Sequence, residues 1–218
     1  MYTVCLIIPG IKNMSPRHYN LGLRQETADS THAKIISAAR ELLAAEYGTT
    51  EFTIDAVAKK ADVARMTVYN RFKSKTGLIE AVFDDIAAHG QMTQMPTVFA
   101  QSTSLATLDR LIGIFGEFWS SDRLVIRRIR ALGALDHDTG QALSSRDQDR
   151  LQLVEAVLTK VALEHGRPAP DSFHESTNMV YAFTGFEFFD ALAGAEQSPQ
   201  AVVPTVQRLV RGALGLPK

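Results

Sequence analysis

The side chains best suited to chemistry in this sequence lie close together, in residues 53–75. A helix predicted there directs six side chains outward: Arg65, Met66, Thr67, Tyr69, Asn70 and Arg71. Arginine can hydrogen-bond to guanine and asparagine to adenine, and methionine or a threonine methyl group can contact the methyl group of thymine. The hydroxyl groups of Thr53 and Tyr69 and the ammonium group of Lys75 suit backbone phosphates. This combination predicts contact with DNA.

The distribution of charge agrees with a polyanionic partner for this segment. Residues 1–75 hold eleven Lys or Arg and seven Asp or Glu, a balance of +4, whereas residues 76–218 hold twelve and seventeen, a balance of −5. Six of the basic residues and two of the acidic ones lie in residues 53–75. A basic end on an otherwise acidic chain favours a polyanion there. An ordinary fluctuation on a solvated surface would give the same counts, so charge alone leaves both interpretations open.

Two short helices joined by a tight turn are predicted to position these side chains. The first begins at Thr53, a good N-cap, and the second covers roughly residues 65–72, with the turn at residues 61–64 between them. A supporting helix begins near Ser74. The apolar residues that hold these helices together are Ile54, Val57, Ala58, Val63, Val68 and Phe72. In such a helix-turn-helix the second helix enters the major groove while the first crosses the backbone.

The spacing of residues in this segment resembles the signature of the TetR family of transcriptional repressors. The likeness covers about residues 35–83. The residues that carry it are Ala58, Ala61, Val63, Thr67, Val68, Tyr69, Phe72, Ser74, Lys75 and Leu78, with Ala64 at the position of the family's serine. The resemblance implies base contacts from Arg65, Met66, Thr67 and Asn70, and phosphate contacts from Thr53, Tyr69 and Lys75. The alternative, a small helical subdomain whose basic face is only solvated, would make this outward face a coincidence.

Two positions depart from the family pattern. Asp62 stands where the family has its turn glycine, and aspartate tolerates left-handed geometry better than most residues. Ala64 stands where the second helix usually has a serine N-cap, so we expect that helix end to be less well capped. Both changes concern the geometry of the turn and leave the outward side chains in place.

The whole chain is predicted to be all-α, with about nine helices. Residues 30–88 form the three-helix DNA-binding domain after a poorly ordered extension at residues 1–29, and residues 89–218 form a helical domain for ligand binding and dimerisation. Whether residues 1–13 belong to the protein stays open. The helices outside the motif are expected at residues 31–47, 105–120, 123–135, 140–165, 172–193 and 200–214.

The resemblance implies a small-molecule pocket and a dimer interface in the second domain. Four aromatic residues could line the pocket, although plain core packing explains each of them as well: Phe115, Trp119, Phe183 and Phe186. Glu187 and Asn178 could orient a polar ligand group or face water. The helix at residues 172–193 is apolar on nearly every side, so it must be buried on two sides, for example by its own core and by a second subunit. Its interface residues would be Phe188, Phe189 and Leu192.

A basic cluster on the helix at residues 123–135 has two interpretations. Its members are Arg123, Arg127, Arg128 and Arg130. The cluster could reach DNA or the first domain, but a solvated face paired with acidic side chains is the favoured interpretation.

Other classes of protein find little support in the sequence. With 45% hydrophobic and 22% charged residues, the composition is that of an ordinary globular protein. Cys5 is the only cysteine, and the six histidines show no paired ligand spacing. No nucleophile elbow or carboxylate cluster with a partner histidine occurs. The apolar run at residues 4–8 is too short to span a membrane, and no positive residue precedes it as in a signal peptide. We therefore expect a cytoplasmic protein with no metal, no cofactor and no enzymatic activity.

Three functions remain to be weighed. The leading one is a repressor that a small, partly apolar molecule releases from a palindromic DNA operator, with the protein acting as a homodimer. The second is an architectural or corepressor-type DNA-binding protein without a ligand, which a fully packed second domain would favour. The third is a small helical enzyme with an incidental basic end, which would need a polar cleft of convergent titratable groups.

Overall fold

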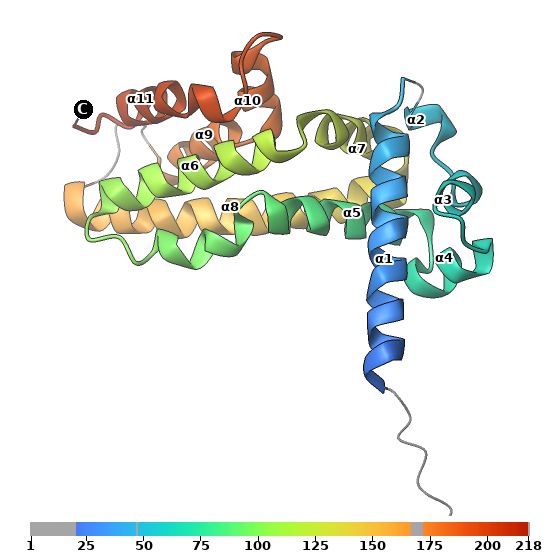
Figure 1. Cartoon of the computed structure of the whole chain (residues 1–218). Coiled ribbons are helices and arrows are strands. Elements are labelled where there is room, and N and C mark those ends of the chain that lie inside the picture. The colour runs from blue at the N-terminus through green and yellow to red at the C-terminus, as the bar shows by residue number, and fades with distance from the viewer. Residues whose placement is uncertain (1–20, 47, 167–171, 218) are drawn as a thin grey trace, which may run out of the picture.

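The computed structural model describes residues 21–46, 48–166 and 172–217, and over these residues the fold is all-helical, as the sequence predicts (Figure 1). The expectations for residues 1–20 lie outside the described residues. The elements are α1 (Leu21–Ala44), α2 (Gly48–Glu51), α3 (Ile54–Lys60), α4 (Arg65–Phe72), α5 (Lys75–His89), η1 (Met92–Val98), α6 (Ser104–Ser121), α7 (Arg123–Leu135), α8 (His137–His165), α9 (Phe173–Phe183), α10 (Phe186–Ala193), η2 (Gln200–Val202) and α11 (Val203–Ala213).

Most of the predicted helices are present, and those of the motif have the expected bounds. The predicted start of α3 and the bounds of α4 and α7 are confirmed. The first helix was predicted at residues 31–47, but α1 begins at Leu21 and ends at Ala44. Residues 23–30 contain no glycine or proline, so nothing in the sequence stops the helix from extending toward the N-terminus. A short separate helix, α2, follows instead of a single longer one.

The start of α8 also differs from the prediction, for a local reason. Asp136 caps the helix: its Oδ1 accepts a hydrogen bond from the backbone N–H of Thr139 at 2.9 Å. Aspartate is a strong N-cap, so the helix begins at His137 rather than at residue 140. The pKa of the Asp136 carboxyl is lowered, mainly by this hydrogen bonding to Thr139.

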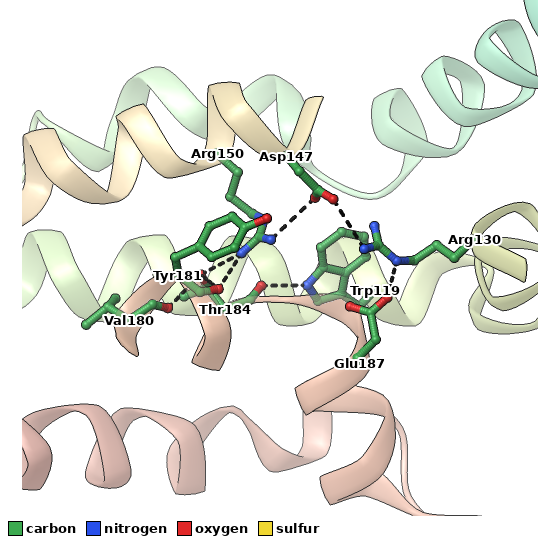
Figure 2. Close-up of polar contacts among 8 residues, drawn as sticks. All are labelled: Trp119, Arg130, Asp147, Arg150, Val180, Tyr181, Thr184 and Glu187. Carbon is green, nitrogen blue, oxygen red and sulfur yellow. Dashed lines mark hydrogen bonds and ion pairs between the residues drawn. The ribbon is translucent and has the colours of Figure 1, made fainter. Parts of the chain in front are cut away.

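The helix predicted at residues 172–193 is wrong as one continuous helix, because the chain breaks between α9 and α10. Side chains from two other helices replace the lost backbone bonds (Figure 2). Arg150 of α8 donates to the carbonyl oxygen of Tyr181 at 2.5 Å and to Oγ1 of Thr184 at 3.2 Å. The indole Nε1 of Trp119, from α6, donates to the carbonyl oxygen of Thr184 at 3.0 Å. The break is therefore stabilised by tertiary contacts.

The helices form a small head and a long body, with α5 shared between them (Figure 1). In the head, α1 packs against α3 and α5, and α4 packs against α3 and α5. In the body, α5 packs against α6 and α8, while α9, α10 and α11 lie along the side of α6 and α8. One contiguous set of buried apolar side chains runs through both parts. A change in the body that moves α5 therefore reaches the head directly.

Ion pairs and a helix cap fasten the head to the body. Arg40 of α1 pairs with Asp85 of α5 and with Asp122, each at 2.9 Å. Arg128 of α7 donates to the carbonyl oxygens of Leu43 and Ala45, where α1 ends. A cation at a helix C-terminus is stabilised by the free carbonyl groups and the helix dipole. The basic cluster on α7 therefore reaches the first domain through one of its members.

The other three arginines of that cluster pair with acidic side chains, as the favoured interpretation expects. Arg123 and Arg127 share Asp190, with N–O distances of 2.5 and 2.7 Å. Arg130 pairs with Asp147 and Glu187.

Over the part of the chain that the structure describes, no helix is long and apolar enough to span a bilayer.

Candidate nucleic-acid interface and internal cavity

The turn between α3 and α4 has the geometry that the sequence predicts. Thr53 caps α3, since its Oγ1 accepts from the backbone N–H of Ala56 at 3.1 Å. Asp62 has a φ of 53°, the left-handed conformation expected for the position of the family's glycine. Ala64 is the N-cap of α4 and makes no side-chain hydrogen bond. The N–H groups at the start of α4 are thus left without a side-chain cap.

The start of α5 lies close to the end of α4. Ser74 is the N-cap, and its Oγ accepts from the backbone N–H of Gly77 at 2.9 Å. A Cβ atom at Gly77 would lie 2.2 Å from the carbonyl oxygen of Phe72. Only glycine allows this approach, because the neighbour is backbone and cannot rotate away. The sequence pattern alone does not reveal this requirement for glycine at position 77.

The side chains of α4 divide into a buried row and an outward face. Val68 and Phe72 are buried against α3 and α5. The outward residues include Met66, which is 62% exposed, and Tyr69, which is 54% exposed. Arg65 and Asn70 are also exposed, whereas Thr67 and Arg71 are half-buried. The structure brings these predicted contact residues onto one helix at the surface of the head.

The charged groups of this face are held weakly by the protein itself. Nε of Arg65 lies 3.3 Å from Oδ1 of Asp55, but both side chains are largely exposed, so the pair is weak and easily exchanged. Nζ of Lys75 lies 5.9 Å from the centroid of the Phe52 ring, and the residue is half-buried. The hydroxyl of Thr53, although it caps α3, can still donate its proton to an acceptor.

Two other basic side chains of the motif already have partners. Nζ of Lys60 pairs with Glu41 at 2.8 Å, and Nζ of Lys73 donates to the carbonyl oxygen of Asn70 at 2.6 Å. These helices thus define a helix-turn-helix domain that presents an exposed helix with hydrogen-bonding and basic side chains. Such a domain is built to read the major groove of DNA.

Comparison with known proteins identifies this domain more closely. Residues 35–82 match the model of the bacterial regulatory proteins of the tetR family. The chain therefore carries the DNA-binding domain of the TetR family, and it is a DNA-binding transcriptional regulator. The resemblance in the motif is thereby confirmed. No curated protein matches the chain in sequence.

Solved structures extend the likeness of the fold to the second domain. The fatty acid degradation regulator FadR from Bacillus halodurans is 18% identical, with a TM-score of 0.66, over 86% of this chain and 97% of that one. FadR from Bacillus subtilis, in complex with stearoyl-CoA, is 18% identical, with a TM-score of 0.63, over 82% and 96%. NalD, secondary repressor of the MexAB-OprM multidrug efflux pump in Pseudomonas aeruginosa, is 15% identical, with a TM-score of 0.65, over 87% and 98%. At these identities the likeness concerns the fold.

The body contains a cavity of about 270 Å³ that is partly open to solvent. Of the four aromatic residues expected at a pocket, Phe115 and Trp119 line it. Phe186 lies behind, against the Trp119 ring with centroids 5.6 Å apart, and Phe183 packs on Phe188 with centroids 4.7 Å apart. The further lining residues are Phe83, Ala87, Met92, Met95, Phe118, Arg130, Leu143, Arg146, Asp147, Asp149, Arg150 and Leu153.

One wall of the cavity is polar, and most of its residues were not predicted from the sequence. Nη2 of Arg130 and Nη2 of Arg150 each lie 3.3 Å from a different oxygen of Asp147 (Figure 2). Burial lowers the pKa of Arg150, although Asp147 opposes this effect. Burial also acts on Arg130, but there Asp147 and Glu187 prevail and raise the pKa. No pattern along α8 reveals this wall, because packing alone decides which face of that helix lies inward.

The two polar residues expected near the pocket have different positions. Glu187 is exposed and pairs with Arg130, so it touches the polar wall from outside the cavity. Asn178 lies at the surface and contacts the His174 ring, with Nδ2 and Nε2 2.9 Å apart.

The three residues expected at the dimer interface also differ in their burial. Phe189 is fully buried within the chain, so its prediction as an interface residue is wrong. The break before α10 turns this ring toward α6, where a Cβ atom on Gly116 would lie 3.2 Å from the ring. Phe188 is half-buried, and Leu192 is 37% exposed. On the neighbouring α11, Leu209 is 43% exposed.

Proposed function

We propose that the protein is a ligand-responsive repressor: a cytoplasmic homodimer that leaves a palindromic operator when a small molecule enters the cavity of the body. The observation that carries this proposal is the double role of α5. This helix packs against α4 and α1 in the head, and its side chains Phe83 and Ala87 line the cavity. A ligand in contact with α5 can therefore alter the pose of the recognition helix.

A charged contact strengthens this connection. Arg146 of α8 lines the cavity, pairs with Asp84 of α5 at 2.7 Å, and has its guanidinium 5.2 Å from the centroid of the Phe83 ring. A ligand that displaces Arg146 would release α5 from α8. The differential contact that a conformational change requires would thus lie in the cavity wall.

The proposed dimer follows from the needs of recognition. One short helix reads only a few base pairs, too few for a useful specificity ratio in a genome. A two-fold dimer doubles the site and requires a palindromic operator with half-sites about one helical turn apart. The half-exposed apolar side chains of α10 and α11, among them Phe188, Leu192 and Leu209, offer a surface for the second subunit.

The structural relatives support the proposals that the protein binds a ligand and acts as a repressor. The Bacillus subtilis relative was solved with stearoyl-CoA, and the Pseudomonas aeruginosa relative is a repressor. A DNA-binding protein without a ligand would be favoured by a fully packed second domain. The cavity of about 270 Å³ instead favours a protein that responds to a small molecule.

Selection of bound DNA from a random pool tests the DNA-binding and dimer parts together. The expected result is a palindromic motif, bound by a protein that sediments as a dimer at micromolar concentration. An asymmetric motif bound by a monomer would rule the dimer out. Ligands are then screened by release of the selected DNA, and a chain that never releases it would be a regulator without an effector.

A further inference from the structure

The chemistry of the cavity wall indicates what kind of molecule it holds. Its polar part consists of two arginines and one carboxylate, contributed by α7 and α8 (Figure 2). Both contacts of Asp147, to Arg130 and to Arg150, measure 3.3 Å. Strong charge-assisted hydrogen bonds between such groups measure about 2.7–2.9 Å. One carboxylate is therefore shared loosely between two guanidinium groups.

Of the two guanidinium groups, that of Arg150 lacks a carboxylate of its own. Arg130 has a second carboxylate, Glu187, as a partner of its own. Arg150 is 7% exposed, and apart from Asp147 it contacts neutral groups: it donates to oxygens of Tyr181 and Thr184, and its guanidinium lies 3.8 Å from the centroid of the Tyr181 ring. A buried charge without full compensation is unfavourable. The wall thus carries an excess of positive charge at Arg150.

A free hydrogen-bond donor lies in the same wall. Nε of Arg150 is buried and has no hydrogen-bond partner among the described residues. Buried donors are nearly always paired, and an unpaired one costs free energy. Because Arg150 lines the cavity, an acceptor on a bound molecule would satisfy this N–H group.

The remaining charged lining residues do not cancel this excess. Arg146 is paired with Asp84 on α5 at 2.7 Å. Asp149 is exposed, so its charge is largely screened by water. The rest of the lining is apolar, with phenylalanine, leucine and methionine side chains, and methionine adapts readily to the shape of a ligand.

We propose that the cavity binds a small apolar carboxylic acid, whose carboxylate accepts a hydrogen bond from Nε of Arg150 and whose apolar body lies among the phenylalanine rings. This inference rests on the proposed function only in taking the cavity as the effector site. A single negative charge matches the excess on the wall, whereas a dianion would be repelled by Asp147. The volume of about 270 Å³ lies just below the usual range for ligand pockets, about 300–1,000 Å³, so the acid is small.

The cavity contains its own reporter, because Trp119 is the only tryptophan of the chain and lines the wall. Its fluorescence is titrated in the wild-type protein with hexanoate, octanoate and decanoate. Decanol, methyl decanoate and decylamine serve as matched neutral and cationic controls. The acids should give a saturable change, with the alcohol and ester about tenfold weaker or more and the amine inactive. Equal affinity of acid, alcohol and ester would overturn the proposal, as would the absence of binding by every acid.

Two substitutions and a matched control locate the carboxylate. Arg150→Gln removes the charge and should weaken the acids about tenfold or more while leaving the alcohol unchanged, whereas Arg127→Gln, outside the cavity and 51% exposed, should change neither. If Arg150→Gln does not fold, Ala87→Leu fills part of the cavity and should weaken acid and alcohol alike. Unchanged acid binding in the folded Arg150→Gln or Ala87→Leu variant would refute the site.

The response of DNA separates this inference from the proposed function. An acid that binds but does not release the operator supports the inference and contradicts the ligand-responsive repressor. A neutral molecule that binds the cavity more tightly than any acid and releases the operator supports the repressor and contradicts the inference. Release by octanoate or decanoate, lost in the Arg150→Gln variant and kept in Arg127→Gln, supports both.

Discussion

Replacing Arg65 by alanine should separate reading of the base sequence from general attraction to DNA. The side chain is 72% exposed and pairs with Asp55 at 3.3 Å, so the variant should fold normally. Surface substitutions of this kind change the free energy of unfolding by within about ±0.5 kcal/mol. Any loss of DNA affinity can then be assigned to the contact itself.

The size of that loss follows from two opposing contributions. A good contact between arginine and a base contributes about 1–3 kcal/mol of discrimination against the wrong base. Leaving Asp55 costs Arg65 about 0.2–1 kcal/mol, as for other exposed ion pairs. The net loss in Arg65→Ala should therefore be about 1–2 kcal/mol, roughly a factor of 5–30 in Kd.

Gel-shift titrations at one fixed salt concentration measure this effect on the selected operator and on its single-base variants. Arg65→Ala should lose affinity for the best sequence and discriminate less at one base position in each half-site. Asp55→Asn is the control, because it frees Arg65 without removing it and should slightly strengthen binding. If Arg65→Ala keeps the wild-type affinity and base preference, Arg65 does not read DNA and the assignment is refuted.

Three further predictions concern other parts of the chain. Lys75→Ala should weaken binding to all DNA sequences about equally and reduce the salt dependence of binding by about one charge, as measured by titrations at several salt concentrations. A loss of affinity confined to a single base position would contradict a phosphate contact. Phe188→Glu should give folded monomers with weak operator binding, whereas Phe189→Glu should lower the thermal stability, because the Phe189 ring is buried within the chain. Sedimentation and thermal unfolding distinguish the two variants. A dimeric Phe188→Glu variant would exclude this part of α10 from the interface. Burial works against the charge of Asp190, but the arginines of α7 prevail and hold its pKa below the ordinary value of 3.8. A lowered carboxyl pKa contributes stability above its unfolded value that is lost as pH falls, so urea unfolding from about pH 6 to about pH 3 should show the wild type losing its advantage over Asp190→Asn; a constant difference would contradict the pairing.

The sequence by itself determined the DNA-binding module, because its structure depends on neighbours along the chain. The N-caps Thr53 and Ser74 and the left-handed Asp62 act within a few residues of their own position. The helical period then decides which side chains of α4 are buried and which lie outward. Local signals of this kind can be read from a single sequence, so the motif and the outward side chains of α4 were predictable.

The cavity and the surface of the body were decided by tertiary structure. The break between α9 and α10 depends on Arg150 and Trp119, which come from distant helices and satisfy backbone groups that a continuous helix would have paired. That break turns Phe189 into the core. The polar wall depends likewise on which face of α8 lies inward, and the apolar pattern of one helix cannot show which neighbour covers it. Contacts between residues far apart in the chain leave no period in the sequence, and for that reason only the folded structure reveals them.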